Sequence, residues 1–221
     1  MIKLYHFFKK ISSPKFCLSC LSQSEFYICN KCLTKNNFHF SKFCFECGKK
    51  INQECIYLTH SRLIKFLISF GKYENELLKR IILLGKEQSL EILKDIGYFI
   101  SQEMKNLNFK EYYLTPVPLT KNKVIKRGYN QSEILAQTIA NNLGINIFKG
   151  LIKKKETKDQ GSLNYEARKT NLKGAFGVNE KSPSNIILVD DIKTTGATLK
   201  ECAVTLKKAG AKNIIALTVL T

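Results

Sequence analysis

Residues 186–198 constrain the fold of this chain more than any other segment. They read Ile-Ile-Leu-Val-Asp-Asp-Ile-Lys-Thr-Thr-Gly-Ala-Thr, and the opening apolar run is typical of a parallel strand covered on both faces. Such a strand would deliver Asp190 and Asp191 at its carboxyl end, which is the edge where open α/β sheets bind ligands. The segment therefore predicts an α/β fold with a ligand site at one edge of its sheet.

The turn at residues 193–198 has the composition of a phosphate-binding loop. Gly196 would let the backbone approach an anion, the hydroxyl side chains add donors, and the following helix presents its positive end. The loop suits a terminal phosphate, while the two acids suit sugar hydroxyls or magnesium; a bare magnesium site is the alternative. No Walker A pattern is present, which argues against a P-loop ATPase. Lys193 at the loop tip is expected to be solvated.

The rest of the second half alternates between strands and helices. We expect strands at 63–70, 112–117, 186–189 and 214–219, and helices at 74–84, 90–104, 131–143 and 198–208. Gly85 is expected to end the first of these helices, and residues 149–177 are expected to be flexible. Alternation of this kind implies a parallel sheet with helices on its faces.

Seven of the eight cysteines lie between residues 17 and 55, mostly in pairs with two residues between them. Two such Cys-x-x-Cys knuckles can enclose a zinc ion in a tetrahedron, and the first two contain Cys17, Cys20, Cys29 and Cys32. A third knuckle would form a second site from Cys44, Cys47, Cys55 and His60. The alternatives are a lost site with buried thiols, or cross-pairing of the knuckles. Because so short a piece buries little apolar surface, we predict a zinc-binding domain at 1–60 and an α/β domain at 61–221.

The chain is strongly basic. Its 221 residues include 36 Lys and Arg against 18 Asp and Glu, a net charge of +18, which favours polyanions or phosphate-bearing partners. Aromatic residues accompany lysines in the cysteine-rich part, and they form either a small core around zinc or a surface on which unpaired bases stack: Phe38, Phe40, Phe43 and Phe45. The sequence has no membrane-spanning run and no secretory signal, which predicts a cytoplasmic protein.

Residues 186–198 resemble the phosphoribosyl pyrophosphate (PRPP) motif of type I phosphoribosyltransferases. The knuckles, Val117-Pro118 and the segment 127–136 further resemble the ComF (ComFC) family of competence-associated, phosphoribosyltransferase-like proteins, as do Gln160, Leu163, Arg168, Asn171 and residues 174–176. The resemblance implies a parallel-sheet type I phosphoribosyltransferase fold with a small N-terminal zinc-ribbon-like domain. The incomplete fourth knuckle departs from the family pattern.

The resemblance also implies roles for individual residues. Asp190 and Asp191 would hold the ribose hydroxyls of PRPP, and the loop would wrap its 5-phosphate through Thr194, Thr195, Gly196, Ala197 and Thr198. Lys126 and Arg127 would face the pyrophosphate, which gathers charge as it departs. Alternatively, Arg127 pairs with Glu133. Arg168 would lie in a loop that closes over the site; alternatively, it pairs with Glu166 or caps a helix.

The ComF family is associated with natural transformation, in which DNA crosses the inner membrane as a single strand. The resemblance therefore implies a competence protein that binds single-stranded DNA, carries a PRPP site, and uses structural zinc and magnesium with PRPP. A helicase or the DNA-uptake machinery is the implied partner. An active magnesium-dependent phosphoribosyltransferase with a nucleobase or amine acceptor is the alternative, and a PRPP or nucleotide sensor is a third reading. The motif specifies phosphate and ribose only, so it leaves enzyme activity open.

Overall fold

The computed structural model describes residues 14–36, 38, 40–51, 63–156 and 172–221. The chain divides into two compact units, Met1–Phe38 and His39–Thr221. In the first unit, the described residues include the helix α2 (Asn30–Lys35). The predicted domain boundary at residue 60 lies outside the described residues, and residues 40–51 group with the second unit.

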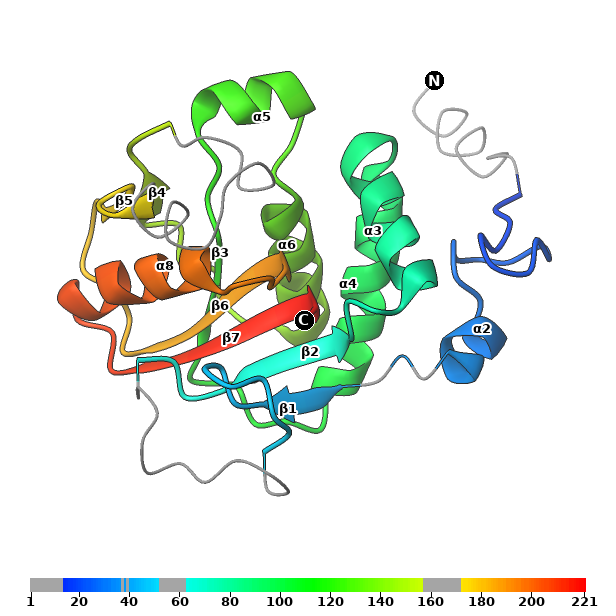
Figure 1. Cartoon of the computed structure of the whole chain (residues 1–221), viewed down its shortest axis with the longest axis horizontal. Helices are drawn as coiled ribbons and strands as arrows, with labels where there is room; N and C mark the ends of the chain where they lie inside the picture. The colour runs from blue at the N-terminus through cyan, green and yellow to red at the C-terminus, as the bar shows by residue number, and fades with distance from the viewer. Residues whose placement is uncertain (1–13, 37, 39, 52–62, 157–171) are drawn as a thin grey trace, which may run out of the picture. The chain divides into compact units, whose positions relative to one another are not determined.

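A five-stranded sheet forms the centre of the second unit, in the order β1-β2-β7-β6-β3 (Figure 1). Its strands are β1 (Ser41–Phe43), β2 (Leu67–Gly71), β3 (Tyr113–Pro116), β6 (Asn185–Ile192) and β7 (Asn213–Leu220). The last four of these strands run parallel, whereas β1 pairs antiparallel with β2 at one edge. The predicted α/β class with a mostly parallel sheet is therefore confirmed.

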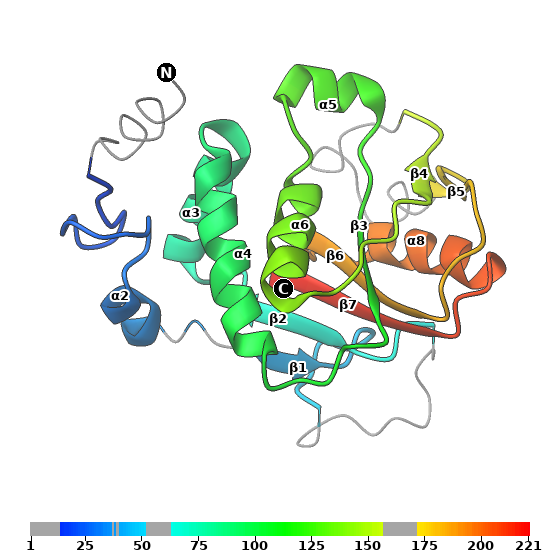
Figure 2. The same cartoon turned by 180° about the vertical axis from the view of Figure 1, so that it is seen from behind.

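Helices cover both faces of this sheet (Figures 1 and 2). One face carries α3 (Glu76–Glu87), α4 (Leu90–Met104) and α6 (Gln131–Leu143); the other carries α8 (Ala197–Lys208). Beside α8 lies a two-stranded ribbon of β4 (Leu151–Lys153) and β5 (Phe176–Val178). Ile186 and Leu188 of β6 pack in one core with Leu199, Cys202 and Leu206 of α8. Because both faces are covered, β6 and β7 are buried along most of their length, as their apolar sequences predict.

Two helices have the predicted bounds, α4 and α6, whereas α3 continues beyond Gly85, where we expected it to end. That expectation is wrong because Gly85 is a packing position: a Cβ there would lie 2.9 Å from the side chain of Leu93 in α4. The glycine thus allows α3 and α4 to approach closely. None of the helices in the described part of the chain has the length and apolar character that a bilayer span requires.

The segment expected to be flexible contributes β4 and most of β5. Its residues 157–171, which include Gln160, Leu163 and Arg168, lie outside the described residues. A further helix, α5 (Lys121–Arg127), connects β3 to α6 and was not predicted.

Candidate functional site

Four cysteines of the first unit converge on one point. Their Sγ atoms all lie within 4.8 Å of one another, and those of Cys20 and Cys29 are 3.8 Å apart. Tetrahedral zinc with Zn–S bonds of about 2.3 Å places its sulfur atoms about 3.8 Å apart. Ser22 Oγ lies 2.8 Å from Cys20 Sγ, and this hydrogen bond lowers the pKa of Cys20 to about 6. The cluster therefore fits a metal ion such as zinc, and its residues are the predicted Cys17, Cys20, Cys29 and Cys32.

The third knuckle belongs to the second unit. Cys44 is buried and Cys47 is exposed, and the N–H of Gly48 donates to the carbonyl of Cys44 at 3.0 Å. Gly48 has a φ of 71°, which suits the turn that closes the knuckle. Cys55 and His60, predicted as the other two ligands of this site, lie outside the described residues.

Two adjacent acids lie at the carboxyl end of β6, as predicted. Asp190 Oδ1 accepts hydrogen bonds from Ser132 Oγ at 2.9 Å and from the N–H of Asp191 at 3.0 Å. Burial and the neighbouring charge of Asp191 raise the pKa of Asp190 to about 8. Asp191 pairs with Lys86 of α3, with 2.5 Å between Nζ and Oδ2 and little exposure of either side chain. The two acids therefore differ in environment: Asp190 is buried and favours its protonated form, whereas Asp191 lies against the ammonium group of Lys86.

The residues after β6 form the predicted loop. Gly196 has a φ of 75°, in the left-handed region that favours glycine, and caps the N-terminus of α8. Within the described part of the chain, the N–H groups of Thr194, Thr195 and Gly196 donate to no protein acceptor. Unpaired N–H groups beside a helix N-terminus form a favourable environment for an anion. Ala197 and Thr198, which we expected in the loop, form the first turn of α8.

The third knuckle packs against this loop. A Cβ at Gly196 would lie 3.0 Å from Cζ of Phe45, and Lys193 Nζ lies 5.3 Å from the centre of the Phe45 ring. The neighbouring Glu46 pairs with Lys200 of α8 at 2.6 Å. Burial lowers the pKa of Lys193. Lys193, which we expected to be solvated, is partly exposed, and Phe45 of the knuckle lies against it.

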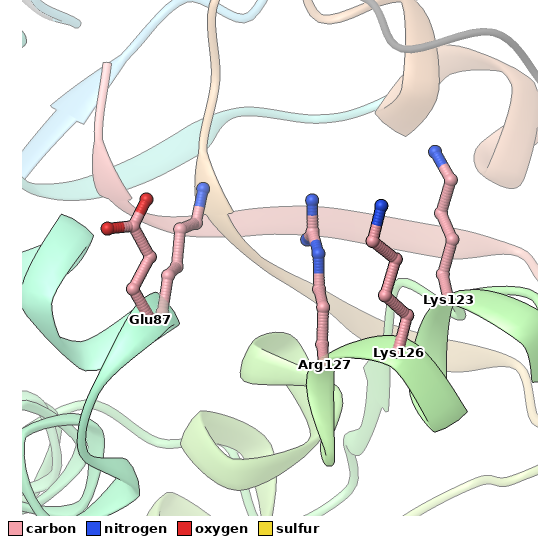
Figure 3. Close-up of a pocket in the computed structure, with 5 residues that line it drawn as sticks. Glu87, Lys123, Lys126 and Arg127 are labelled. Atoms are coloured by element: carbon pink, nitrogen blue, oxygen red, sulfur yellow. The ribbon is translucent and has the colours of Figure 1, made fainter.

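A basic pocket of about 400 Å³ is connected to the acid pair through Lys86, which both lines the pocket and binds Asp191. Its lining residues are Lys86, Glu87, Lys123, Lys126 and Arg127. Figure 3 shows the side chains of Lys123, Lys126 and Arg127 extending in the same direction from α5. Among the described residues no ion pair joins Arg127 to Glu133, the alternative role considered for Arg127. With four cations and one acid, the pocket suits an anionic ligand.

Two lining residues were not identified from the sequence. Lys123 precedes Lys126 by about one helical turn, so recognition of α5 as a helix would have pointed to it. Lys86 lies in the last turn of α3, where basic residues are common because they interact favourably with the helix dipole. The sequence alone therefore gives no sign of its role, because only the tertiary fold brings it to Asp191.

The aromatic residues of the cysteine-rich part do not form a stacking surface. Phe38, Phe43 and Phe45 are all buried, and the ring of Phe40 lies edge to face against Phe70. Phe43 and Phe45 contribute to the core of the second unit. The interpretation of these rings as a base-binding surface is therefore wrong, because they pack inside the protein.

Comparisons with known proteins identify similar chains. The chain is 28% identical to Competence protein F of Haemophilus influenzae over 92% of this chain and 89% of that protein. It is 29% identical to Competence protein ComFC of Streptococcus pneumoniae over 76% of this chain and 67% of that protein. DNA utilization protein YhgH of Salmonella typhi is 35% identical over 46% of this chain and 45% of that protein. These similarities confirm the resemblance to the ComF and ComFC proteins.

No protein-family model matches the chain. A search of solved structures returns a hypoxanthine phosphoribosyltransferase from Staphylococcus aureus, which is 12% identical with a TM-score of 0.33. That similarity covers 57% of this chain and 59% of the other.

Proposed function

We propose that this relative of Competence protein F and ComFC acts in natural transformation or DNA use, where it binds single-stranded DNA and holds PRPP at the carboxyl edge of its sheet. The supporting observation is that the acid pair ends β6 and the loop follows it directly, while Lys86 joins the acids to the basic pocket. PRPP has a ribose with phosphate groups at two positions. Its binding requires carboxylates that accept hydrogen bonds from the ribose hydroxyls, placed between two sites that bind anions.

Each part of the site takes one portion of PRPP in this proposal. The N–H groups of Thr194, Thr195 and Gly196 receive the 5-phosphate, the acids receive the ribose hydroxyls, and the pocket cations receive the pyrophosphate. The carboxylate oxygens of Asp190 and Asp191 suit magnesium, which would further neutralise the pyrophosphate. Asp190 must lose its proton to serve as a carboxylate, because its pKa is raised to about 8.

The net charge of +18 supports the nucleic-acid part of the proposal. Lysine contacts with phosphates release counterions, so affinity for DNA should fall steeply as salt rises. The proposal includes structural zinc at the four-cysteine cluster, a cytoplasmic location where the entering strand is handled, and a helicase or the uptake machinery as partner. Anisotropy of a labelled oligonucleotide at rising salt tests the DNA part, and a flat salt profile rejects phosphate-led binding.

Calorimetric titration of PRPP with magnesium tests the small-molecule site. The double variant Asp190→Asn/Asp191→Asn should bind at least tenfold more weakly than the wild type, because both hydroxyl acceptors are altered. Glu91→Gln, an exposed acid paired with Lys94 on α4, is the matched control and should bind like the wild type. Equal affinities for all three proteins would remove the two acids from the site.

The four cations of the pocket also favour a second candidate, a magnesium-dependent phosphoribosyltransferase with a nucleobase or amine acceptor. The acceptor nitrogen would attack the anomeric carbon as the bond to pyrophosphate breaks, and the pocket would stabilise the charge that gathers on the departing oxygens. The Arg127 guanidinium can hold two phosphate oxygens at once. Enzyme-dependent release of pyrophosphate that Arg127→Gln abolishes would support this activity, and no release with any nucleobase or amine would reject it.

A further inference from the structure

The helix α5 is unusual because it contributes nothing to the core. None of its residues is buried, and Ile125 is 81% exposed, the highest value among the exposed large apolar side chains of the described residues. A seven-residue helix has little stability of its own in water, and an aliphatic side chain gains nothing from such exposure. Figures 1 and 2 show α5 standing out from the sheet beyond the end of β3.

The charge of α5 has one sign. The helix carries no acid, and its cations are Lys121, Lys123, Lys126 and Arg127. Three of these also line the basic pocket, where Lys86 adds a fifth cation and Glu87 is the acid. The surface of α5 and the pocket together therefore form one positive region, which extends beyond the pocket to Lys121 and has the charge to bind a chain of phosphates.

We propose that α5 is a contact surface for single-stranded DNA, a proposal that rests on the DNA binding proposed above. Lys121, outside the pocket lining, contacts a phosphate of the strand, and Ile125 packs against an unpaired base. Lys126 and Arg127 contact neighbouring phosphates of the strand when the pocket holds no pyrophosphate. The apolar contact requires a base that is free of its partner strand, because in a duplex the base faces are stacked and covered. Ile125 thus favours the single strand, whereas the cations bind single-stranded and duplex DNA alike.

Two variants and two matched controls test this surface by anisotropy with a labelled single strand at several salt concentrations. Lys121→Gln, outside the pocket lining, should reduce the slope of log affinity against log salt by about 0.7, the loss of one phosphate contact. Lys105→Gln, an exposed lysine after α4, removes the same charge and should leave the slope unchanged. Ile125→Ala should weaken binding to the single strand roughly three- to tenfold with the slope unchanged. Leu83→Ala, which removes another exposed aliphatic side chain, should have no effect.

The same titrations with duplex DNA should show no effect of Ile125→Ala. If the wild type binds the single strand with a salt slope but both α5 variants behave like their controls, the surface is wrong and DNA binding lies elsewhere. If the wild type does not bind the single strand, the proposed DNA function fails together with this inference. Binding of anionic vesicles that depends on Ile125, without binding of DNA, overturns the proposal in favour of a membrane contact.

Discussion

The carboxylate of Glu46 lies 2.6 Å from the ammonium group of Lys200, which joins the third cysteine knuckle to the first turns of α8. Beside this ion pair, the ring of Phe45 packs against Gly196, and the ammonium group of Lys193 lies over the ring. The knuckle therefore contacts both the loop and the helix that follows it, and we expect a change in the knuckle to alter how the loop presents its N–H groups.

Replacing Phe45 by leucine should lower both stability and anion affinity. The loss of ring volume should cost roughly 1 kcal/mol in unfolding free energy, and the loosened loop should bind PRPP several-fold more weakly. Phe43→Leu is the matched control, because Phe43 is similarly buried in the same core, whereas the atoms nearest to a Cβ at Gly196 belong to Phe45 and Lys193. Urea denaturation and calorimetric titration measure the two effects. Equal losses of affinity in both variants would show that the knuckle has no specific role at the loop.

Gly196→Ala should weaken phosphate binding more than backbone strain alone explains. Gly144 has a similar φ, 67° against 75°, but has no atom within 4 Å of an added Cβ, whereas Gly196 faces Phe45 at 3.0 Å. Both substitutions should cost about 1–2 kcal/mol of stability through left-handed backbone strain. Only Gly196→Ala should also reduce PRPP affinity, because it displaces the loop. An unchanged affinity in a folded Gly196→Ala protein would contradict the assignment of the loop.

Lys86→Gln should reduce affinity for pyrophosphate about tenfold, because Lys86 lines the pocket and neutralises Asp191. Lys79→Gln on the same helix is the control; Lys79 pairs with the exposed Glu76. Titration of pyrophosphate into both variants provides the measurement. Similar affinities for the two variants would place the pyrophosphate away from Lys86.

The raised pKa of Asp190 makes stability depend on pH. Its pKa rises from an ordinary 3.8 to about 8 in the folded chain, so between these values the folded state binds a proton that the unfolded state has lost. Stability must then fall as pH rises through this range. Asp190→Asn removes the effect, so the unfolding free energy of the variant minus that of the wild type should increase from pH 5 to pH 8. Taking this difference cancels the titration of groups common to both proteins, and a difference that is flat with pH would show that Asp190 ionises normally.

Removal of zinc should unfold the cysteine cluster without unfolding the sheet. A strong chelator should increase hydrogen exchange in peptides from residues 14–36, because the ion substitutes for a core in this small unit. Peptides from β6 and β7 should keep their protection. Cys17→Ser should mimic the chelator, whereas Cys202→Ser, which alters a buried thiol of α8 in the second unit, should retain the metal. A protein that exchanges equally with and without chelator would not depend on a metal at this cluster.

The elements that could be predicted from sequence are those whose burial leaves a periodic pattern. The apolar stripes of α4 and α6 define both helices to the residue, and the continuous apolar run before Asp190 identifies β6. The same logic fails for α5, because a helix with no buried residue leaves no stripe. Sequence reasoning is also wrong at Gly85. Glycine is typical of helix ends, but here its missing side chain leaves room for Leu93 of the neighbouring helix.

Sequence reasoning identified the part of the candidate site whose residues are consecutive in the chain. Asp190, Asp191 and the loop lie on one stretch of chain, so a local motif describes them. Lys86 and Phe45 are distant from this stretch in the sequence, and only the tertiary fold brings them into contact with Asp191 and Gly196. No local sequence pattern indicates such contacts. The same reason explains why four phenylalanines near cysteines could be taken for a surface: their burial is decided by partners elsewhere in the chain.

The edge strand β1 has a consequence for how such proteins diversify. Residues 41–43 precede the cysteines of the third knuckle, yet they pair with β2 in the central sheet. A genetic exchange of the cysteine-rich region as far as residue 60 would also replace the strand β1 and Phe45, which packs against the loop at Gly196. Recombination can therefore shuffle the N-terminal metal module without damage only if the crossover falls upstream of β1.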